Sequence, residues 1–515
     1  MKATSFYNRM LAALLLMAGL VSCASEDNAV NNSGTDNTDE LTTFVAGTYD
    51  NGNAKTRTSM NYDDGAFFWE EGDKIYVKDD EGMWRVSSNA VNADKVSYFK
   101  FMMPGKYTAS NTYTVCYPGT TGNQDQVTIA AGQRQDVPDD TRHFGRSGDC
   151  GIATATKGSD GKFHFRLDHK AAYLVFNIHT ENQALKNCLL TKIQVTADNN
   201  IAGTYTVTHG GLIGDGSSKQ ITLETKEVYG GAKPHTTRVA QAYDEGFPMY
   251  NDFKVYMVIA PGTHTLKVRY WIKDYVTNME GAITKNYPSF TYAANNYYDM
   301  QANLDVRSYD SKYYMWDAQQ HYWYGYENEQ PTENDQYNLN YPQNYTDPNN
   351  RWYHLGVGPF NASVSCTVCP NANELSWYAM QGDPRWDNEE LWTVMGHLYI
   401  GGMWVKKKAH IPGFRSDVSA DGSTDMRTTS IDYQNNNLTP GLPGATEIGN
   451  YFYLPALGYY SLGRLKNVGK YGRYWSSNAV PESTNNSYSL YFDQSSVKVY
   501  NNYLRDNGFR VLPFE

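Results

Sequence analysis

Apolar and polar residues alternate with a period of two in several short segments of this chain. Residues 163–167 read Phe-His-Phe-Arg-Leu, and residues 253–259 read Phe-Lys-Val-Tyr-Met-Val-Ile. Because successive side chains of a strand point to opposite faces of a sheet, this pattern predicts half-buried strands. Pro261-Gly262 predicts a turn into a returning strand, which would make a hairpin. No long helical stretch separates such segments over residues 41–303, which favours antiparallel β-sandwiches, two in tandem for about 260 residues.

The beginning of the chain has the composition of a bacterial secretory signal. Lys2 and Arg9 flank an apolar run over residues 10–21, and this run is shorter than the ~20 residues that span a bilayer. Ser22 before Cys23 resembles the lipobox of bacterial lipoproteins, which implies signal removal over residues 1–22 and acylation of Cys23. The alternative is a chance cysteine near a plain cleavage site.

Residues 23–40 contain many acids and little apolar surface, which predicts a flexible acidic tether. Ser25-Glu26-Asp27 within it looks like the export tag of surface lipoproteins in the Bacteroides group. The implied location is the cell outer membrane, where the protein is lipid-anchored and exposed at the surface.

Charge and cysteine content exclude several classes of partner. The formal net charge is −11, and signal removal takes away two cations, which argues against nucleic acid or an anionic membrane surface as a partner. Besides Cys23 the chain has five cysteines, and this odd number argues against a disulfide-framed scaffold. Cys366 and Cys369 have the spacing of a redox or half-zinc motif. Neither a second ligand pair nor a βαβ context is nearby, so we expect a local disulfide or two plain thiols, and no metal or cofactor.

Three segments between residues 41 and 307 carry a resemblance to a known family. Residues 42–46, 56–58 and 67–77 together resemble the opening of the fimbrillin family of Bacteroidetes pilins, with its W-x-x-G-D-x-I strand. Residues 165–176 and the YMVIAPG segment at 256–262 look like two later landmarks of that family. The resemblance implies an N-terminal sandwich over residues 41–162 and a second one over 163–307.

The composition changes after residue 307, where eight of the 11 tryptophans lie. Asn371 with Glu374, and Asp387 with Glu390, each have the spacing of a capping box, which predicts two short helices. For the second helix, apolar residues follow at helical spacing through Tyr399, before a Gly-Gly stop.

The order LPA-x-G, YWSS and G-F-x-V-x-P closes this region and resembles a C-terminal module of Bacteroidetes and Fibrobacter surface proteins. That module is related to the C-type-lectin and sulfatase-modifying fold. We therefore expect an α+β, C-type-lectin-like, aromatic-rich module over residues 308–515. The whole chain is then mainly β, with two sandwiches followed by this module.

No constellation of catalytic residues accompanies these modules. The sulfatase-modifying enzymes use cysteines late in the domain, whereas this chain has none after Cys369. Common nucleophile, zinc-protease and phosphate-loop motifs are missing, so we expect no enzymatic activity. Exposed aromatic faces are the remaining binding signal. The candidates are Trp316, Trp323 and Trp352, with core packing as the alternative for each.

Pilins of the fimbrillin family reach the surface as lipoproteins, and an Arg-specific protease cuts after their first strand. A strand from the next subunit then fills the groove. The resemblance implies a cut after Arg57, which is otherwise a solvated loop arginine. Because about 200 residues follow the second sandwich, the subunit would accept a strand but could hardly donate one. This favours a fimbrial tip or accessory subunit that mediates adhesion.

The implied partners are other pilin subunits, bound by β-strand addition, and a host or bacterial surface glycan or protein. The outer membrane would be a partner through the lipid anchor until processing transfers the subunit to the fimbrium. One alternative is a surface lipoprotein that binds glycan or protein and never polymerises. A second alternative is an enzyme on the lectin-like scaffold.

Overall fold

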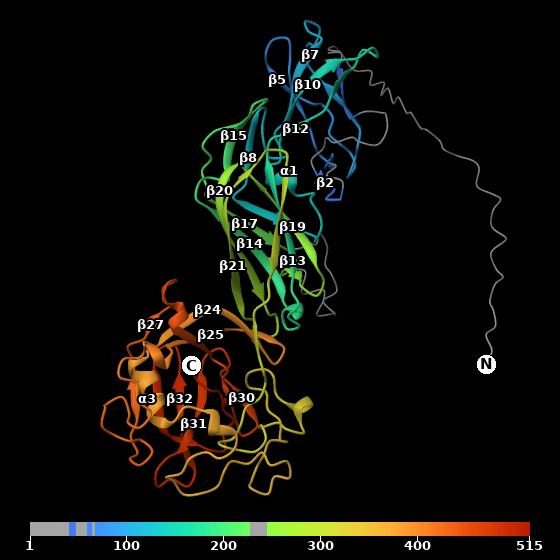
Figure 1. Ribbon diagram of the computed structural model, residues 1–515. Helices are drawn as coiled ribbons and strands as arrows, with labels where there is room; N and C mark the ends of the chain where they lie inside the picture. The colour runs from blue at the N-terminus through green and yellow to red at the C-terminus, as the bar shows by residue number, and fades with distance from the viewer. Residues whose placement is uncertain (1–40, 48–58, 64–66, 227–244) are drawn as a thin grey trace, which may run out of the picture. The chain divides into compact units, whose positions relative to one another are not determined.

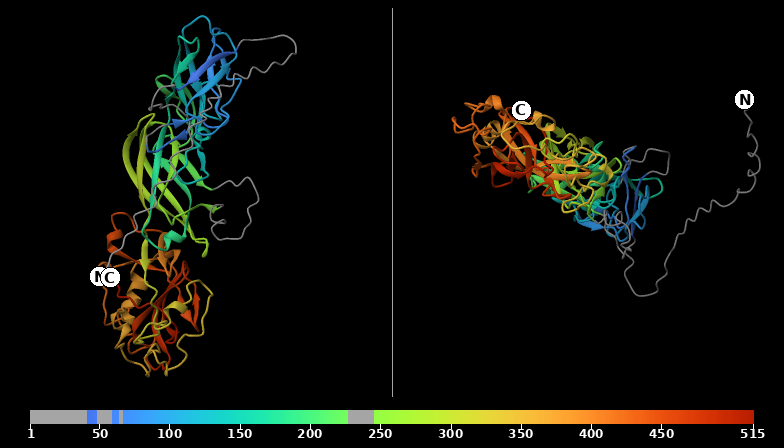
Figure 2. Two further views of the ribbon diagram at one scale, coloured as in Figure 1. Left: turned by 90° about the vertical axis from the view of Figure 1, so that its right-hand side faces the viewer. Right: turned by 90° about the horizontal axis from the view of Figure 1, so that it is seen from below.

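The computed structural model describes residues 41–47, 59–63, 67–226 and 245–515, and these are mainly β-structure (Figures 1 and 2). This confirms the β-rich fold class predicted from the alternating segments, while the particular domain types stay predictions. Within the described ranges, no helix has the length and apolar character needed to cross a bilayer. Cys23 and Arg57 lie outside the described residues.

The first sheet has eight strands and contains β1 (Thr42–Ala46) in its interior. Its order is β5-β4-β7-β10-β11-β1-β6, and β12 also pairs with β10. The other bounds are β4 (Tyr76–Lys78), β5 (Trp84–Val86), β6 (Phe99–Met103), β7 (Thr112–Tyr117), β10 (Gly151–Lys157), β11 (Phe163–Phe165) and β12 (Asp168–His169). Its core includes Trp69, which is fully buried. Beside this sheet, β2 (Ser59–Met60) pairs with β3 (Phe67–Phe68).

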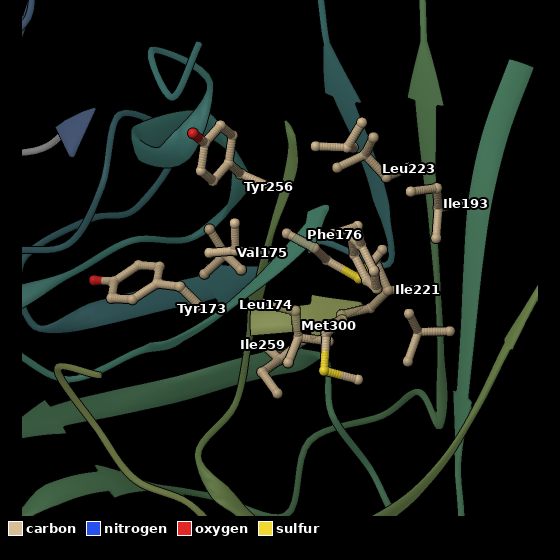
Figure 3. Packing of buried hydrophobic residues seen from close by; sticks show 14 of the residues in the cluster. Tyr173, Leu174, Val175, Phe176, Ile193, Ile221, Leu223, Tyr256, Ile259 and Met300 are labelled. Carbon is tan, nitrogen blue, oxygen red and sulfur yellow. The ribbon is translucent and has the colours of Figure 1, made fainter. Parts of the chain in front are cut away.

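Three further sheets surround the largest core. The first has the order β19-β13-β22, the second β21-β20-β14-β17-β9 with β18 on β14, and the third β16-β15-β8. Figure 3 shows side chains of β13, β14, β17, β19 and β22 gathered in this core. The bounds are β8 (Gln126–Ile129), β9 (Gly132–Gln135), β13 (Ala172–His179), β14 (Leu189–Ala197), β15 (Gly203–Thr208), β16 (Gly211–Ile213), β17 (Gln220–Thr225), β18 (Phe247–Pro248), β19 (Phe253–Ile259), β20 (Gly262–Lys273), β21 (Glu280–Tyr292) and β22 (Tyr297–Asn303). The short helices α1 (Phe144–Ser147) and η1 (Leu185–Asn187) complete this part.

Strand pairing does not follow the boundary predicted between residues 162 and 163. Strand β11 starts at Phe163 and pairs with β10 and β1 of the first sheet. Conversely, β8 and β9 come from before residue 162 and pair with β15 and β17. Both differences from the predicted boundary are pairings between strands that are distant in the sequence. Local sequence patterns do not predict such pairings.

The strands on either side of Pro261-Gly262 exist as predicted, but they do not form a hairpin. Strand β19 pairs antiparallel with β13, whereas β20 pairs with β14 and β21. The turn therefore carries the chain from one sheet to another. Residues 255–259 are all buried, which fits a strand covered on both faces better than a half-buried one.

Side chains rather than a neighbouring strand satisfy the outer edge of β19. Val258 donates its N–H to Gln133 Oε1 at 3.0 Å and accepts from Gln133 Nε2 at 2.6 Å. Tyr256 donates its N–H to Gln135 Oε1 at 2.8 Å, and its carbonyl accepts from His143 Nε2 at 2.9 Å. An edge closed in this way offers no unpaired backbone groups to another chain.

Residues 307–515, here called the C-terminal module, contain two larger sheets and one hairpin. Sheet β23-β24-β25-β28, with β27 on β24, begins with β23 at Arg307, and the second sheet has the order β26-β33-β32-β31. The bounds are β23 (Arg307–Tyr309), β24 (Arg385–Val394), β25 (His397–Lys406), β26 (Tyr433–Asn435), β27 (Thr439–Pro440), β28 (Tyr451–Pro455), β29 (Tyr459–Ser461), β30 (Arg464–Lys466), β31 (Gly472–Ala479), β32 (Asn486–Phe492) and β33 (Val497–Leu504). The helical segments are α3 (Ala372–Gln381), η2 (Glu327–Glu329), η3 (Ser365–Val368), η4 (Lys408–His410) and η5 (Ile448–Asn450).

One of the two predicted helices is confirmed and the other is wrong. Asn371 caps α3, and Glu374 completes the capping box as predicted. The segment after Asp387 instead forms the antiparallel hairpin of β24 and β25. Asp387 Oδ1 accepts from the N–H groups of Glu389 and Glu390 and so closes a β-bulge. A helix N-cap uses the same short-range pattern, which explains why the spacing suggested a helix.

Candidate functional site

Strand β1 fills a groove between two other strands of the first sheet. It runs parallel to β11 and antiparallel to β6, with Phe44 opposite both Phe163 and Phe101. Phe44 and Val45 are fully buried and Ala46 is 1% exposed. Removal of β1 would therefore leave two unpaired strand edges and an apolar trough, which is a suitable seat for another extended strand.

Aromatic contacts define the deepest position of this groove. The Phe44 ring stacks on Phe163 with the centroids 4.8 Å apart, and it meets the ring of Tyr107 edge-on at 5.1 Å. Burial of a phenylalanine or valine side chain stabilises by about 2 kcal/mol. Gly47 ends the strand at a positive φ of 91°, and a Cβ there would lie 2.7 Å from Ser97 O. A strand that replaces β1 thus needs large apolar residues opposite Phe163 and a small residue at its end.

Of the three tryptophans predicted as ligand contacts, two lie in the core. Trp316 is 0% and Trp323 is 1% exposed, so neither ring face is accessible to a ligand. Trp316 donates from Nε1 to Ser476 O at 2.9 Å. Trp352 is half-buried and packs against Tyr353, with the ring centroids 4.9 Å apart. Trp352 is therefore the candidate with an accessible surface.

Trp352 lines an open cavity of about 410 Å³ in the C-terminal module. Exposed apolar side chains stand at its rim, with Tyr345 71% and Leu355 54% exposed. Asp317, which also lines it, is fully buried and accepts from His354 Nδ1 at 2.7 Å and from Val364 N at 2.8 Å. The carboxylate thus shapes the wall of the cavity, while the aromatic and aliphatic rim is the part open to a ligand. These rim residues carry no signal in the sequence, because they form a patch only when the fold brings them to the same cavity.

A buried arginine holds the loop that carries this cavity. Arg505 is fully buried and donates to Gly356 O at 2.9 Å and to Ser487 Oγ at 3.0 Å. Its guanidinium lies 4.8 Å from the ring centre of Trp316. Burial lowers the pKa of Arg505 to about 10. Because one planar group serves several carbonyls, the loop after Trp352 is fixed to the strands of the second sheet of the module.

Cys366 and Cys369 are buried free thiols, as are the other three cysteines in the described part of the chain. Of the two predicted states, the structure has the two plain thiols. Cys366 Sγ accepts a hydrogen bond from Asp317 N at 3.2 Å, and burial raises its pKa well above the ordinary value. Such a thiol has little thiolate character and behaves as a core residue.

Comparison with known proteins gives distant structural similarity over about half of the chain. No family model matches, and no curated protein matches. Several solved structures resemble this chain. One is a candidate cell adhesion protein from Bacteroides ovatus, with 12% sequence identity and a TM-score of 0.31; the similarity covers 52% of this chain and 94% of that protein. Another, from Bacteroides uniformis, has 15% identity and TM-score 0.29, over 52% and 95%. The fimbrial anchor protein Mfa2 from Porphyromonas gingivalis has 10% identity and TM-score 0.23, over 51% and 90%.

Proposed function

We propose that this chain is a surface-exposed adhesion protein that acts as a tip or accessory subunit of a fibre, and that it joins the fibre by strand addition. The observation that carries the proposal is the place of β1 between β11 and β6. Removal of a strand at the edge of a sheet would leave one neighbouring strand unpaired. Removal of an interior strand leaves a groove with hydrogen-bonding partners on both sides. The proposal assigns no catalytic step to the chain.

Cleavage after Arg57 would break the covalent connection between β1 and the rest of the first sheet, because β1 is the only described strand that precedes this residue. A donor strand from another subunit would then regain the backbone hydrogen bonds to β11 and β6. Its apolar side chains would replace Phe44 and Val45. The capped outer edge of β19 complements this scheme, since a fibre subunit must pair at its intended groove and not at other edges.

The C-terminal module supplies the adhesive head in this proposal. The cavity at Trp352 and its exposed rim form a partly apolar surface of the kind that recognises a partner. Through the parallel pairing of β23 with β24, the second sandwich leads directly into this folded module. A subunit built in this way accepts a strand and presents a head. If the chain never polymerises, the same head would serve a stand-alone surface lipoprotein.

A reversible disulfide between β1 and β6 tests whether the groove of β1 can accept another strand. Thr43 lies opposite Met102 on β6, and Thr43 Oγ1 lies 3.7 Å from Met102 Sδ, so cysteines at both positions are placed to form a disulfide. The chain from residue 24 onward, carrying Thr43→Cys and Met102→Cys, is cut with an Arg-specific protease. It is then mixed with a fluorescent peptide that copies residues 41–47. We expect uptake of the peptide only after reduction, because the oxidised protein keeps its own β1.

Thr43→Cys alone is the matched control and should take up the peptide with or without reductant. The native cysteines in the described part are buried, so they do not compete for the new thiols. Equal uptake by the oxidised and the reduced double variant would contradict the groove. No uptake by either would also contradict it. Mature protein that is still acylated at Cys23 on the cell surface would favour the alternative that does not polymerise.

A further inference from the structure

A second cavity in the C-terminal module lies against the sheet β23-β24-β25-β28, apart from the site at Trp352. Its volume is about 620 Å³, in the range of small-molecule sites. All four strands contribute to its lining, and residues 512–515 close one side. The lining includes Arg307 and Tyr309 on β23, Glu390 on β24, Trp404 on β25 and Tyr453 on β28, together with Lys407 and Glu515.

Aromatic side chains from neighbouring strands make the walls. Trp404 on β25 is opposite Tyr453 on β28, and their ring centroids are 5.1 Å apart. Tyr453 lies over Gly402, where an added Cβ would come within 2.4 Å of its ring. The glycine therefore lets the tyrosine lie flat on the sheet and leaves space above it. Trp404 is half-buried, so part of its face is open to the cavity.

Two hydroxyl groups of the lining have unmet hydrogen-bonding capacity. Tyr453 is only 9% exposed, and its buried hydroxyl has no acceptor for its own proton, because the Trp392 indole beside it can only donate. The hydroxyl of Tyr309 is likewise buried and has no acceptor for its own proton, because the Arg307 guanidinium beside it can only donate. Buried polar groups in folded proteins are nearly always paired, and unpaired ones call for an explanation such as a ligand. Both hydroxyls belong to the lining of this one cavity.

Asp387 holds two further lining residues in place. Its Oδ2 accepts from Trp404 Nε1 at 3.0 Å, and its Oδ1 accepts from the N–H of Glu390 at 3.2 Å. Asp387 is 2% exposed, so these hydrogen bonds are shielded from water. The bulge that it closes carries Glu390, which is exposed and lines the cavity as Trp404 does. The aromatic wall and the polar rim are thus built as one unit.

The lining carries charges of both signs, which favours a neutral ligand. Arg307 and Lys407 are cationic, Glu390 and Glu515 are anionic, and Lys407 pairs with Glu515 at 2.9 Å. An anionic ligand would meet the two carboxylates, and a cationic one would meet the two cations. A neutral ligand with many hydroxyl groups can donate to the carboxylates, accept from the cations and pair with the tyrosine hydroxyls, while its apolar face packs on Trp404. We propose that this cavity binds a neutral saccharide.

This inference deepens the adhesive role and rests on it for its biological meaning, since it names a ligand class for the head. The test uses the chain from residue 24 onward and a panel of neutral oligosaccharides, with sialylated and sulfated counterparts. Binding is measured by calorimetry and by tryptophan fluorescence. We expect one or more neutral members to bind, and Tyr453→Phe to weaken that binding about tenfold, as expected for loss of one hydrogen bond in a dry site.

The melting temperature separates a binding role from a structural one. Because the Tyr453 hydroxyl donates no hydrogen bond in the free protein, Tyr453→Phe should leave the melting temperature unchanged or raise it. The matched control is Tyr205→Phe, which also removes a buried unpaired hydroxyl but lies outside this cavity. It should leave saccharide binding unchanged.

Three outcomes would overturn the proposal: no saccharide binds, only the anionic members bind, or Tyr453→Phe binds as tightly as the native chain. None of these measurements requires a cut at Arg57 or uptake of a strand. Failure here would therefore leave the strand-addition scheme standing, and failure of strand uptake would leave saccharide binding standing.

Discussion

Replacement of Gln133 by glutamate tests whether side-chain amides close the edge of β19. Gln133 is 4% exposed, and its amide both accepts from and donates to the backbone of Val258. Gln133→Glu keeps the size and the acceptor but loses the donor, so a carboxylate oxygen would face the Val258 carbonyl. An unsatisfied buried carbonyl costs about 1–3 kcal/mol, and an unpaired buried charge adds to this. We expect the free energy of unfolding to fall by at least about 3 kcal/mol at pH 7.

The loss of unfolding free energy in Gln133→Glu should increase as the pH rises. A protonated glutamic acid can donate to the Val258 carbonyl again, so the folded state raises the pKa of the new side chain above its unfolded value of about 4.3. The folded variant then holds more protons than the unfolded one. Its deficit relative to the native chain should therefore be small below about pH 4 and grow as the pH rises.

Urea denaturation of both proteins at each pH measures the difference in unfolding free energy. Hydrogen exchange of residues 253–259 identifies the transition that contains β19. Gln126→Glu is the control, because the side chain of Gln126 is exposed and its amide group bonds only other side chains. This substitution should change the free energy of unfolding little. If Gln133→Glu lost the same free energy at pH 4 and at pH 7, or lost none, the proposed edge closure would be wrong.

Three further changes test other parts of the structure. Burial lowers the pKa of His143 to about 4, so the unfolded chain binds a proton that the folded chain does not. Stability should fall by up to about 3 kcal/mol as the pH drops from 6.5 to 4, and His143→Gln should remove this part of the pH dependence of urea denaturation. Asp387→Ala should cost about 2–4 kcal/mol and increase hydrogen exchange at the bulge of β24, whereas a helix would show protected amides there. Arg505→Lys should cost about 3 kcal/mol or more in thermal unfolding, since an ammonium cannot reach all the carbonyls that the guanidinium bonds.

Local patterns predicted the local elements with uneven success. The helix start at Asn371 and the strand β19 were predicted correctly, because each depends on residues within a few positions of one another, whereas the burial of both faces of β19 was not predicted. The helix predicted after Asp387 was wrong, because the pattern that suggested it is also confined to a few neighbouring residues. An aspartate that bonds backbone groups two and three residues ahead serves a helix start and a β-bulge equally well. Only the pairing of β24 with β25 distinguishes the two structures.

The candidate tryptophans show a similar limit. Trp316, Trp323 and Trp352 lie in one aromatic-rich segment, yet the first two are core residues and the third lines a cavity. Composition indicates that aromatic side chains are available, but burial depends on which strands pack over them. The cavity at Tyr453 had no signature in the sequence, because its lining comes from four strands and the last four residues of the chain.

The sequence by itself determined that this chain is mainly β and that Asn371 begins a helix. These properties follow from periodicity, capping and hydrophobicity, which act over short stretches of chain. The tertiary structure alone decided that β1 lies inside the first sheet, that glutamines close the edge of β19, and that a cavity opens beside Tyr453. Each of these joins distant parts of the chain; Gln133 and Val258, for example, are 125 positions apart. Such contacts form only when burial of a common core outweighs the entropy of closing the loop between them.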